Sequence, residues 1–488
     1  MTPLPIRFGT DGWRGRIAED FTFENVEIVT QALADFLGEG GGDADRPVLV
    51  GYDRRFLSER FAARVAEVLA GNGLRVGLYR RDLPTPIVSF DVHQERARAG
   101  VVITASHNPP EFNGFKLKES FGGSARPEVT AAVEARLGGS RPRRRPLEQA
   151  VADGLVEWRD PPDEAYFQRL RALVDVEAIR RSDWHILVDP IHGAADRYME
   201  RVLAGGRCRV ETIRAERDPL FSGVNPEPMP QNLAALFEAV RATHATIGLA
   251  HDGDGDRLAA VGEDGSFITP HQIFPLLVQY LVRERGERGI IIRTFSQSVL
   301  VDRIADALGC PVRVVPIGFK YIADLMLTED VLIGGEESGG IGVRGYLPER
   351  DGTFAGLLFL EALIARGERP SEAVRALWRE FGEFHYRRED LHMPVERGKE
   401  IVARLTANPP DRVAGFRVVD VQTLDGTKLL LDDASWILFR QSGTEPVLRV
   451  YVEATSVAKR DQMIEAGLAL VRELSTHAAA SSEGEESR

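Results

Sequence analysis

Three aspartates alternate with glycines directly after an apolar segment. The stretch "IGLAHDGDGDR" contains Asp252, Asp254 and Asp256, separated by Gly253 and Gly255. In an extended chain, alternate side chains lie on one face about 6.6 Å apart, and glycines allow the backbone to curve until the carboxylates converge. Convergent carboxylates repel one another unless a cation is bound, and hard oxygen ligands suit Mg²⁺. The spacing therefore predicts a magnesium site.

Two other interpretations of this acidic stretch are an EF-hand calcium loop and a solvated acidic turn. Glu263 occupies the twelfth position counted from Asp252, as in an EF-hand. The sixth position, however, is Arg257 where that loop requires glycine, and a predicted strand rather than a helix precedes it. Mutual repulsion of the carboxylates also disfavours a turn without a cation.

A second polar stretch, "VITASHNPPEFNGFK" at residues 102–116, follows the end of a predicted buried strand. Its two prolines disfavour a helix, so we expect a turn whose polar side chains are exposed. Ser106 lies in this turn and is a candidate nucleophile.

A glycine-rich stretch, "LIGGEESGGIGVRGYLPERDG", has the Gly-x-Gly-x-x-Gly spacing of a dinucleotide-binding turn at Gly340, Gly342 and Gly345. No helical pattern follows, so the helix N-terminus that binds a pyrophosphate is missing, and we reject that interpretation. Glu336 and Ser338 instead suggest an exposed loop that accepts hydrogen bonds from hydroxyls, with a purely structural turn as the alternative.

The stretch "FRQSGTEPVLRVYV" combines an arginine at a predicted strand end with a small polar turn. Backbone N–H groups and hydroxyls of such a turn can converge on one anion, while a guanidinium offers paired donors. The turn therefore predicts a phosphate-binding loop, with these substrate-binding candidates: Arg440, Ser442, Gly443, Thr444 and Arg449. Together, a metal site, a candidate nucleophile, a hydroxyl-binding loop and a phosphate-binding loop favour phosphoryl transfer on a polyol phosphate.

Composition excludes several classes of protein. The chain has 488 residues, of which 43% are hydrophobic and 28% charged, so we expect three or four domains. A net charge of −13 argues against non-specific nucleic-acid binding. The two cysteines, Cys208 and Cys310, indicate neither a disulfide framework nor a cysteine zinc site. No apolar run has the length of a membrane span, and the N-terminus lacks a signal-peptide core, so we expect a cytoplasmic protein without a membrane partner.

The elements that must position these residues repeat along the chain. Segments beginning at Val48, Ile186 and Ile290 each predict a strand, a polar turn, a helix with apolar residues at three-and-four spacing, and a second strand. From Phe381 the sequence changes to shorter strands and one helix over 457–474, which predicts an α+β domain with a mostly antiparallel sheet.

We therefore predict three related α/β domains with mixed sheets and a C-terminal α+β domain. The predicted boundaries are 1–150 for the serine loop, 151–265 for the metal loop, 266–380 for the hydroxyl-binding loop, 381–475 for the phosphate-binding loop, and a disordered tail at 476–488. The basic segment 137–148, before the second domain, fits a solvated surface loop better than a binding patch.

Four motifs in this order, "TASHNPPEFNGFK", "DGDGDR", "GGEESGG" and "RQSGTEP", resemble the α-D-phosphohexomutase family across nearly the whole chain. The resemblance implies a heart-shaped four-domain isomerase that acts on hexose phosphates, with phosphorylated Ser106 and the three aspartates as Mg²⁺ ligands. It further implies that Lys116 shuttles a proton or stabilises charge and that Glu336 and Ser338 hold sugar hydroxyls. By the same resemblance, the phosphoserine or the transferring oxygens are contacted by His107, Arg257 and Arg14, and Lys320 is a further residue of the cleft.

The resemblance also implies a reaction through a hexose 1,6-bisphosphate, with glucose 1,6-bisphosphate as activator. "GEESGG" followed by "ERDG" is more similar to the phosphoglucomutase branch, because phosphoglucosamine mutases and bifunctional enzymes typically have histidine where Gly340 stands. We therefore expect glucose as the preferred sugar and a monomer or homodimer. Phosphomannomutase and phosphoglucosamine mutase activity, a magnesium-dependent sugar phosphatase and an inactive sugar-phosphate-binding regulator remain alternatives.

Overall fold

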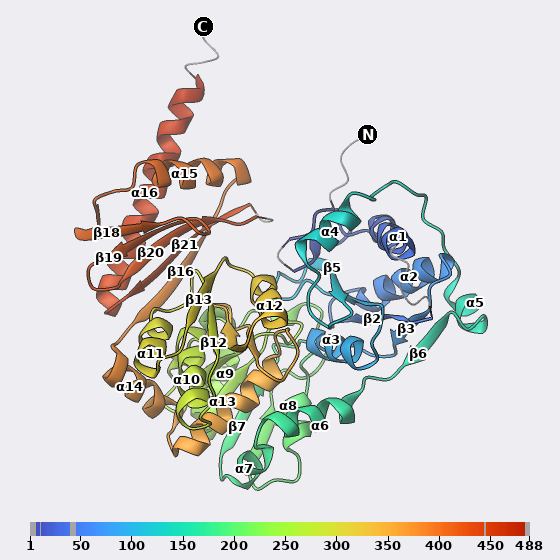
Figure 1. Ribbon diagram of the computed structural model, residues 1–488, viewed down its shortest axis with the longest axis horizontal. Helices are drawn as coiled ribbons and strands as arrows, with labels where there is room; N and C mark the ends of the chain where they lie inside the picture. Colours follow the sequence, from blue (N-terminus) through green and yellow to red (C-terminus); the bar gives the residue numbers. More distant parts are fainter. Residues whose placement is uncertain (1–5, 10, 40–44, 444–445, 484–488) are drawn as a thin grey trace. The chain divides into compact units, whose positions relative to one another are not determined.

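The computed structural model describes residues 6–9, 11–39, 45–443 and 446–483 of the chain (Figure 1). Within it the chain forms two compact units. The first comprises residues 1–292 and 318–374, and the second comprises residues 293–317 and 375–488.

The first sheet has six strands in the order β1-β5-β4-β2-β3-β6. Strands β4, β2, β3 and β6 are mutually parallel, whereas β5 is antiparallel to both β4 and β1. This sheet is therefore mixed, as predicted. Its strands are β1 (Trp13–Arg16), β2 (Val48–Tyr52), β3 (Val76–Tyr79), β4 (Ala99–Ile103), β5 (Phe112–Glu119) and β6 (Val156–Arg159).

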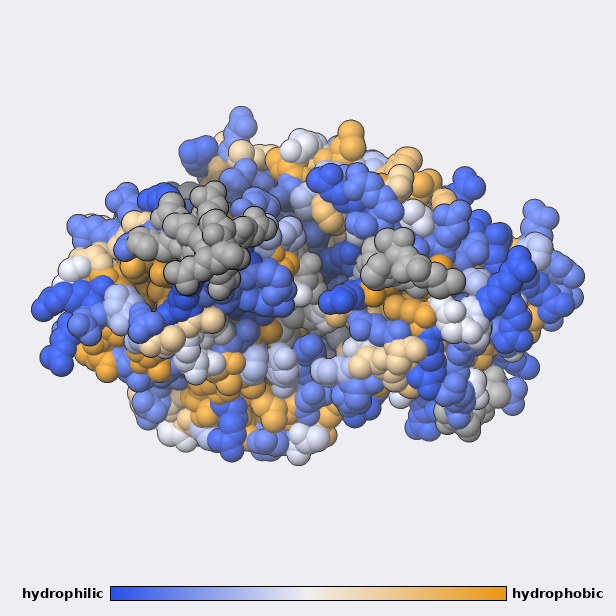
Figure 2. All heavy atoms as spheres, turned by 90° about the horizontal axis from the view of Figure 1, so that it is seen from above, coloured by the Kyte–Doolittle hydropathy of each residue, from blue (hydrophilic) through white to orange (hydrophobic). Residues whose placement is uncertain are grey.

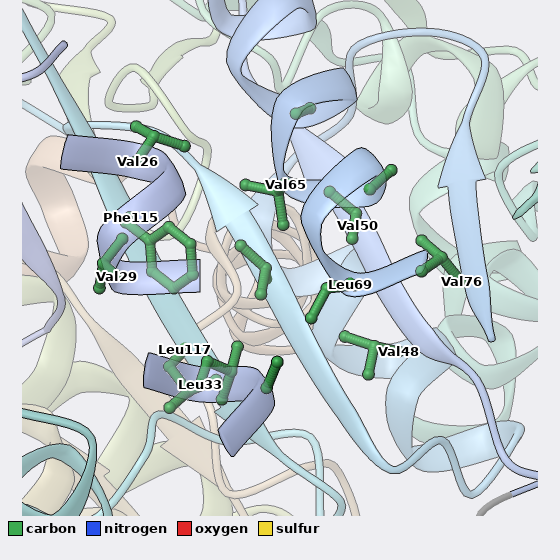
Figure 3. Packing of buried hydrophobic residues seen from close by; sticks show 14 of the residues in the cluster. Val26, Val29, Leu33, Val48, Val50, Val65, Leu69, Val76, Phe115 and Leu117 are labelled. Atoms are coloured by element: carbon green, nitrogen blue, oxygen red, sulfur yellow. The ribbon is translucent and has the colours of Figure 1, made fainter. Parts of the chain in front are cut away.

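The core of this sheet is covered by α1 (Phe23–Glu39) and α2 (Ser58–Gly71). Both helices carry apolar residues at three-and-four spacing, such as Val65 and Leu69 on α2, so one face of each helix is buried. Figure 3 shows these side chains over Val48 and Val50 of β2 and over Phe115 of β5. The remaining helices around this sheet are α3 (Thr85–Gln94), α4 (Pro127–Glu134) and α5 (Leu147–Ala152).

The first sheet extends beyond residue 150, because β6 pairs with β3. A second sheet follows in the order β11-β10-β9-β7-β8, in which β7 is parallel to β8 and β9 and β10 is antiparallel to β9. Its strands are β7 (His185–Asp189), β8 (Arg209–Thr212), β9 (Ile247–Ala250), β10 (Ala259–Gly262) and β11 (Phe267–Ile268). Its helices are α6 (Asp163–Leu173), α7 (Val176–Arg181), α8 (Tyr198–Leu203) and α9 (Ala234–Thr243).

A third sheet has four strands in the order β13-β12-β14-β15. Its strands are β12 (Ile290–Thr294), β13 (Val312–Val315), β14 (Val331–Gly335) and β15 (Ile341–Val343). The accompanying helices are α10 (Pro270–Arg283), α11 (Leu300–Leu308), α12 (Phe319–Thr328), α13 (Gly352–Arg366) and α14 (Pro370–Phe381). The strand–helix–strand units predicted at residues 48, 186 and 290 are thus β2-α2-β3, β7-α8-β8 and β12-α11-β13.

The C-terminal sheet is antiparallel at every described pairing, in the order β16-β21-β20-β19-β18-β17. Its strands are β16 (His385–His392), β17 (Arg412–Val413), β18 (Phe416–Gln422), β19 (Thr427–Leu431), β20 (Trp436–Gln441) and β21 (Val447–Ala454). The helices α15 (Val395–Ala407) and α16 (Val457–Glu483) pack their apolar residues against it. The predicted tail begins inside α16, which continues to Glu483, and 484–488 lie outside the described residues.

On the face shown in Figure 2, hydrophilic side chains are spread between smaller groups of hydrophobic ones, in keeping with a chain that is 28% charged. Among the described residues, none of the helices combines the length and the apolar composition needed to cross a bilayer. Both cysteines are buried free thiols.

Candidate active site

Ser106 lies in the loop between β4 and β5. Its φ of 54° is in the left-handed region, which is costly for a residue with a side chain. Its backbone N–H donates to Thr104 Oγ1 at 2.9 Å, and its hydroxyl donates to Asp252 Oδ2 at 2.8 Å. The side chain is only 1% exposed, so the prediction of an exposed serine is wrong. The loop turns inward because the carboxylate of Asp252 accepts its hydroxyl.

The loop that carries Ser106 is held by a fully buried arginine at the end of β2. The Arg55 guanidinium donates to four backbone carbonyls of this loop, those of Ser106, Asn108, Pro109 and Phe112, at 2.6 to 3.0 Å. Asp53 lies 3.3 Å from Arg55 Nε and balances its charge. These contacts hold Ser106 in its strained conformation.

The three predicted metal-binding aspartates follow β9 and converge as expected. One carboxylate oxygen from each of Asp252, Asp254 and Asp256 lies within 4.8 Å of the other two, and all three side chains are buried. Gly255 has a φ of 75°, and a Cβ at Gly253 would lie 2.4 Å from the carbonyl oxygen of Ser106. These two positions therefore require glycine for the loop to turn and to approach the serine loop.

In both Asp254 and Asp256, one carboxylate oxygen accepts hydrogen bonds from protein donors and the other accepts none. Oδ2 of Asp254 accepts from Lys116 Nζ at 2.8 Å and from Thr85 Oγ1 at 2.5 Å, while Oδ2 of Asp256 accepts from Lys116 and Arg350. The Oδ1 atoms of both residues are buried without a hydrogen-bond partner in the described structure. Buried carboxylate oxygens without a donor are costly, and a bound divalent cation would satisfy both. The donor set thus fits a metal ion.

The electrostatics of the triad are consistent with this fit. Burial, followed by repulsion from Asp256 and Asp254, raises the pKa of Asp252 well above its usual range. Burial also acts to raise the pKa of Asp254, but the charge and hydrogen bond of Lys116, together with the hydrogen bond from Thr85, hold the pKa below its ordinary value. A divalent cation at the Oδ1 atoms would favour the ionised form of both groups.

Lys116 lies on β5 opposite Val102 of β4, which brings it from ten residues away in the sequence to the side of Ser106. Its ammonium is 2.6 Å from Asp11 Oδ2 and also contacts Asp254 and Asp256. Although burial acts to lower the pKa of Lys116, these three carboxylates raise it above its ordinary value, so the side chain is charged.

Two buried residues of this cluster, Asp11 and Arg350, are missing from the predicted site. Arg350 Nη2 lies 2.5 Å from Asp11 and 2.7 Å from Asp256, and Nη1 lies 3.1 Å from Glu336. Burial acts to raise the pKa of Asp11, but Lys116, Lys118 and Arg350 hold it well below its usual range. Asp11 lies in the stretch "GTDGWRG" and Arg350 in "ERDG", but only tertiary contacts distinguish them from surface charges.

Three other predicted residues contact Ser106, its loop or the aspartate triad. Arg14 Nη1 donates to Asn108 Oδ1 at 2.7 Å, so it contacts the serine loop. His107 Nδ1 lies 3.5 Å from the Ser106 hydroxyl. The Arg257 guanidinium lies 3.7 Å from Asp252 and 3.9 Å from Asp256.

The glycine-rich loop connects β14 with β15. Glu336 is only 4% exposed, so the expectation of an exposed loop is wrong for this residue. Burial, only partly offset by Arg350, raises its pKa to about 7. The Ser338 hydroxyl is buried without a hydrogen-bond partner in the described structure, which leaves it available to a ligand. Lys320, in the first turn of α12, lies over the ring of Tyr321 at 5.3 Å.

The phosphate-binding candidates belong to the second unit. Arg440 on β20 pairs in register with Arg449 on β21, and Arg440 Nε lies 2.9 Å from Asp425 Oδ2. The Ser442 N–H donates to the Val447 carbonyl, Gly443 is exposed, and Thr444 lies outside the described residues. Two cationic side chains therefore lie side by side next to the predicted turn.

Comparison with protein-family models finds four matches in order along the chain, described as phosphoglucomutase/phosphomannomutase domains. Alpha/beta/alpha domain I matches residues 5–143, domain II 164–265, domain III 269–381, and the C-terminal domain 394–468.

Two relatives and one solved structure match almost end to end. A Thermococcus kodakarensis protein named phosphoglucomutase/phosphomannomutase is 33% identical, over 96% of this chain and 98% of its own length. A Methanothermobacter thermautotrophicus protein named as a probable phosphoglucosamine mutase is 32% identical, over 93% and 95%. A Thermus thermophilus structure assigned to a phosphomannomutase is 37% identical with a TM-score of 0.84, over 96% of this chain and 99% of that one.

Proposed function

The chain belongs to the phosphoglucomutase/phosphomannomutase family and is a phosphohexomutase of the isomerase class, and we propose that it interconverts glucose 1-phosphate and glucose 6-phosphate through phosphorylated Ser106. One observation carries this proposal. The Ser106 hydroxyl donates to a carboxylate of the buried aspartate triad at 2.8 Å, so a phosphoryl group on this serine would adjoin the metal ligands.

In the proposed reaction, phosphorylated Ser106 gives its phosphoryl group to a free hydroxyl of the bound sugar phosphate. The bond between phosphorus and Ser106 Oγ breaks while a bond from phosphorus to the sugar oxygen forms. Ser106 Oγ gains a proton and the sugar hydroxyl loses one. The hexose 1,6-bisphosphate then reorients and returns its other phosphoryl group to Ser106, so glucose 1,6-bisphosphate acts as both intermediate and activator.

Asp252, Asp254 and Asp256 would hold Mg²⁺ together with an oxygen of phosphorylated Ser106. The unpartnered Oδ1 atoms of Asp254 and Asp256 support this assignment. When bound, the ion supplies positive charge that stabilises the transferring phosphoryl group.

The state of Lys116 favours a charge-stabilising role over that of a general base. Three carboxylates keep its ammonium protonated, so it has no lone pair to accept a proton. As a charged donor beside the triad it can stabilise a phosphoryl oxygen or donate a proton to a departing oxygen. We propose that Arg14, His107 and Arg257 contribute further donors to the phosphoryl group.

The remaining predicted residues would bind the substrate away from the transferring group. Glu336 and Ser338 would hold sugar hydroxyls, and Lys320 would contribute a further cation. Burial of Glu336 and the unpartnered hydroxyl of Ser338 support this role. The second phosphate of the substrate would be bound by Arg440, Ser442, Gly443, Thr444 and Arg449.

Glucose is proposed over mannose and glucosamine because of the glycine-rich loop. Gly340 replaces the histidine typical of the phosphoglucosamine and bifunctional branches. The family relatives include proteins named for glucose, mannose and glucosamine phosphates, so the alternatives are mutases acting on the other two sugars.

The test is a coupled assay with glucose 1-phosphate, mannose 1-phosphate and glucosamine 1-phosphate, in the presence of Mg²⁺, with and without glucose 1,6-bisphosphate. We expect the largest kcat/KM with glucose 1-phosphate, activation by the bisphosphate, and loss of isomerisation in Ser106→Ala. A larger kcat/KM with mannose 1-phosphate or glucosamine 1-phosphate would show that this other sugar is the preferred substrate. Release of inorganic phosphate without isomerisation would indicate a phosphatase instead.

A further inference from the structure

A single arginine joins the glycine-rich loop to the metal loop. Arg350 is 5% exposed, and its Nη2 contacts Asp256 Oδ2 at 2.7 Å while its Nη1 contacts Glu336 Oε2 at 3.1 Å. The same Nη2 lies 2.5 Å from Asp11 Oδ2, and the guanidinium lies 5.6 Å from the centre of the Phe319 ring. One rigid, planar group therefore sets the direction of carboxylates from separate segments.

Position 340 is a glycine, and the Arg350 side chain occupies the space that a side chain at position 340 would need. A Cβ built on Gly340 would lie 2.2 Å from Arg350 Cδ and 2.8 Å from Glu336 Oε2. The structure gives Gly340 no positive φ, so its backbone does not require glycine. Proximity to Arg350 and Glu336 is therefore the reason for glycine here.

The two loops are also joined by the backbone, independently of Arg350. Leu258 N–H, in the metal loop, donates to the Gly339 carbonyl of the glycine-rich loop at 3.1 Å. Gly352 N–H, at the start of α13 and two residues after Arg350, donates to the Gly255 carbonyl of the metal loop at 3.1 Å. The side chain of Arg350 is thus not needed to bring the loops together, and its contacts act on the direction of individual carboxylates.

We propose that Arg350 is a positioning residue that directs Asp256 Oδ1 toward the metal position and fixes the Glu336 carboxylate for the sugar. This inference rests on the proposed function for the sugar, while its metal part concerns the triad alone. Arg350 shares Oδ2 of Asp256 with Lys116 and so leaves Oδ1, which has no hydrogen-bond donor in the described structure, as the ligand oxygen. By holding Oε2 of Glu336, it leaves Oε1 for a hydroxyl.

The charge of Arg350 and its geometry predict opposite effects on metal binding. Removal of a cation beside the triad would by itself tighten Mg²⁺ binding, whereas loss of positioning weakens it. A lysine retains the charge, but a single ammonium cannot reproduce the two-pronged contact with Asp256 and Glu336.

The experiment measures Mg²⁺ binding by calorimetry on the full-length chain without substrate, followed by kinetics at saturating Mg²⁺. We expect Arg350→Met and Arg350→Lys both to weaken Mg²⁺ binding about tenfold. In both variants KM for the sugar phosphate should rise about tenfold with kcat changed much less, because Glu336 binds substrate and transition state alike. Glu336→Gln should add little to KM in the Arg350→Met background.

Gly340→Ala tests the same proposal without changing Arg350. Its methyl group should displace the guanidinium and reproduce the loss of Mg²⁺ affinity, whereas in an Arg350→Ala background it should leave Mg²⁺ affinity almost unchanged. Only Mg²⁺ affinity is compared for this variant, because a Cβ at position 340 would also lie 2.8 Å from Glu336 Oε2. The matched control is Arg366→Met, which removes a largely buried ion pair with Glu368 at the other end of α13 and should change neither constant.

An Arg350→Lys variant equal to the wild type in both constants would overturn the proposal, as would tighter Mg²⁺ binding in Arg350→Met. Thermal unfolding establishes whether each variant is folded. If an Arg350 variant does not fold, Gly340→Ala is used in its place. A wild-type chain that isomerises none of the three sugars would instead overturn the proposed function, and the Mg²⁺ titrations would still test the role of Arg350.

Discussion

At the residue scale, the aspartate triad shows how one side chain can serve both the protein and a ligand. Oδ2 of Asp254 is held by Lys116 and Thr85, while Oδ1 has no donor among the described residues. A bound cation would therefore offset the cost of burying that oxygen. Oδ1 of Asp256 likewise has no hydrogen-bond donor among the described residues, so a metal ion bound between the two residues would satisfy both oxygens.

Asp254→Asn tests this division directly. The amide removes one negative charge and presents an N–H to Lys116, so we expect Mg²⁺ affinity to fall at least about tenfold, measured by calorimetry. The control is Asp264→Asn, in the exposed turn after β10, where the carboxylate accepts local bonds from Ser266. Unchanged Mg²⁺ affinity in Asp254→Asn would contradict the metal assignment.

Glu336 predicts a dependence of substrate binding on pH. Its pKa of about 7 means that the carboxylate is lost as pH falls through neutrality. We expect KM for the sugar phosphate to rise below pH 7 in the wild type, whereas Glu336→Gln should have a raised KM with a flatter pH profile. The comparison between the two proteins removes the contribution of the phosphate group of the substrate, which also titrates near pH 6.

The same shift has a consequence for stability. A carboxyl whose folded pKa lies above its unfolded value costs stability once pH exceeds the unfolded value of 4.5, and the cost is complete above pH 7. Glu336→Gln should therefore raise the unfolding free energy at pH 8 more than at pH 5. An equal effect at both values would show that Glu336 is not buried as described.

At the element scale, the serine loop depends on a strand end that is far away in the sequence. Arg55 follows β2 and donates to four carbonyls of the loop after β4, and parallel pairing of these two strands brings both ends to the same edge. Asp53 contributes to the same assembly by accepting from Thr104 Oγ1 at 2.6 Å. The strained φ of Ser106 is thus supported by neighbouring elements.

Arg55→Lys should loosen this loop while keeping the positive charge. One ammonium cannot replace the guanidinium contacts, and buried carbonyls without donors cost about 1 to 3 kcal/mol each. We expect a lower unfolding temperature and a shorter lifetime of phosphorylated Ser106, measured by calorimetry and by intact-mass spectrometry. Arg60→Lys, at an exposed position on α2, is the control, and similar behaviour of the two variants would exclude a role for Arg55 in the loop.

At the scale of the whole molecule, the second compact unit joins residues 293–317 to the C-terminal sheet through a buried lysine. Lys428 on β19 is 2% exposed, donates to the Phe295 carbonyl at 2.9 Å, and lies 3.9 Å from the centre of the Trp436 ring. Burial, followed by repulsion from Arg293, lowers its pKa to about 7, against weaker attraction from Glu453 and Asp302.

The lowered pKa gives the stability of this unit a defined pH dependence. Below pH 7, Lys428 is charged in both states and its full cost to folding is present. Between pH 7 and about 10.4 only the unfolded chain keeps the proton, so the contribution of this group to stability rises with pH. We expect Lys428→Met to be more stable than the wild type at pH 6, with a difference that shrinks toward pH 10 in thermal unfolding. A difference independent of pH would contradict this account.

Local pattern in the sequence was sufficient to predict the strand–helix–strand units and the antiparallel C-terminal strands. The spacing of apolar residues indicates which face of an element is buried. This spacing is regular in β2-α2-β3 and in the strands β18 to β21. It missed β16 and α15, whose charged residues dilute the periodicity. The residue types of one short segment also identified the aspartate triad. Gly253 and Gly255 lie between the aspartates, so the convergence of the three carboxylates depends only on this segment.

Only the tertiary structure decided which isolated charges join the site and whether Ser106 is buried. Asp11, Arg55 and Arg350 come from three distant segments and meet the site loops through strand pairing and loop contacts. Their spacing in the sequence carries no signal, since an ion pair depends on distance in space. For the same reason, the inward turn of Ser106 follows from the position of Asp252, which lies 146 residues away along the chain.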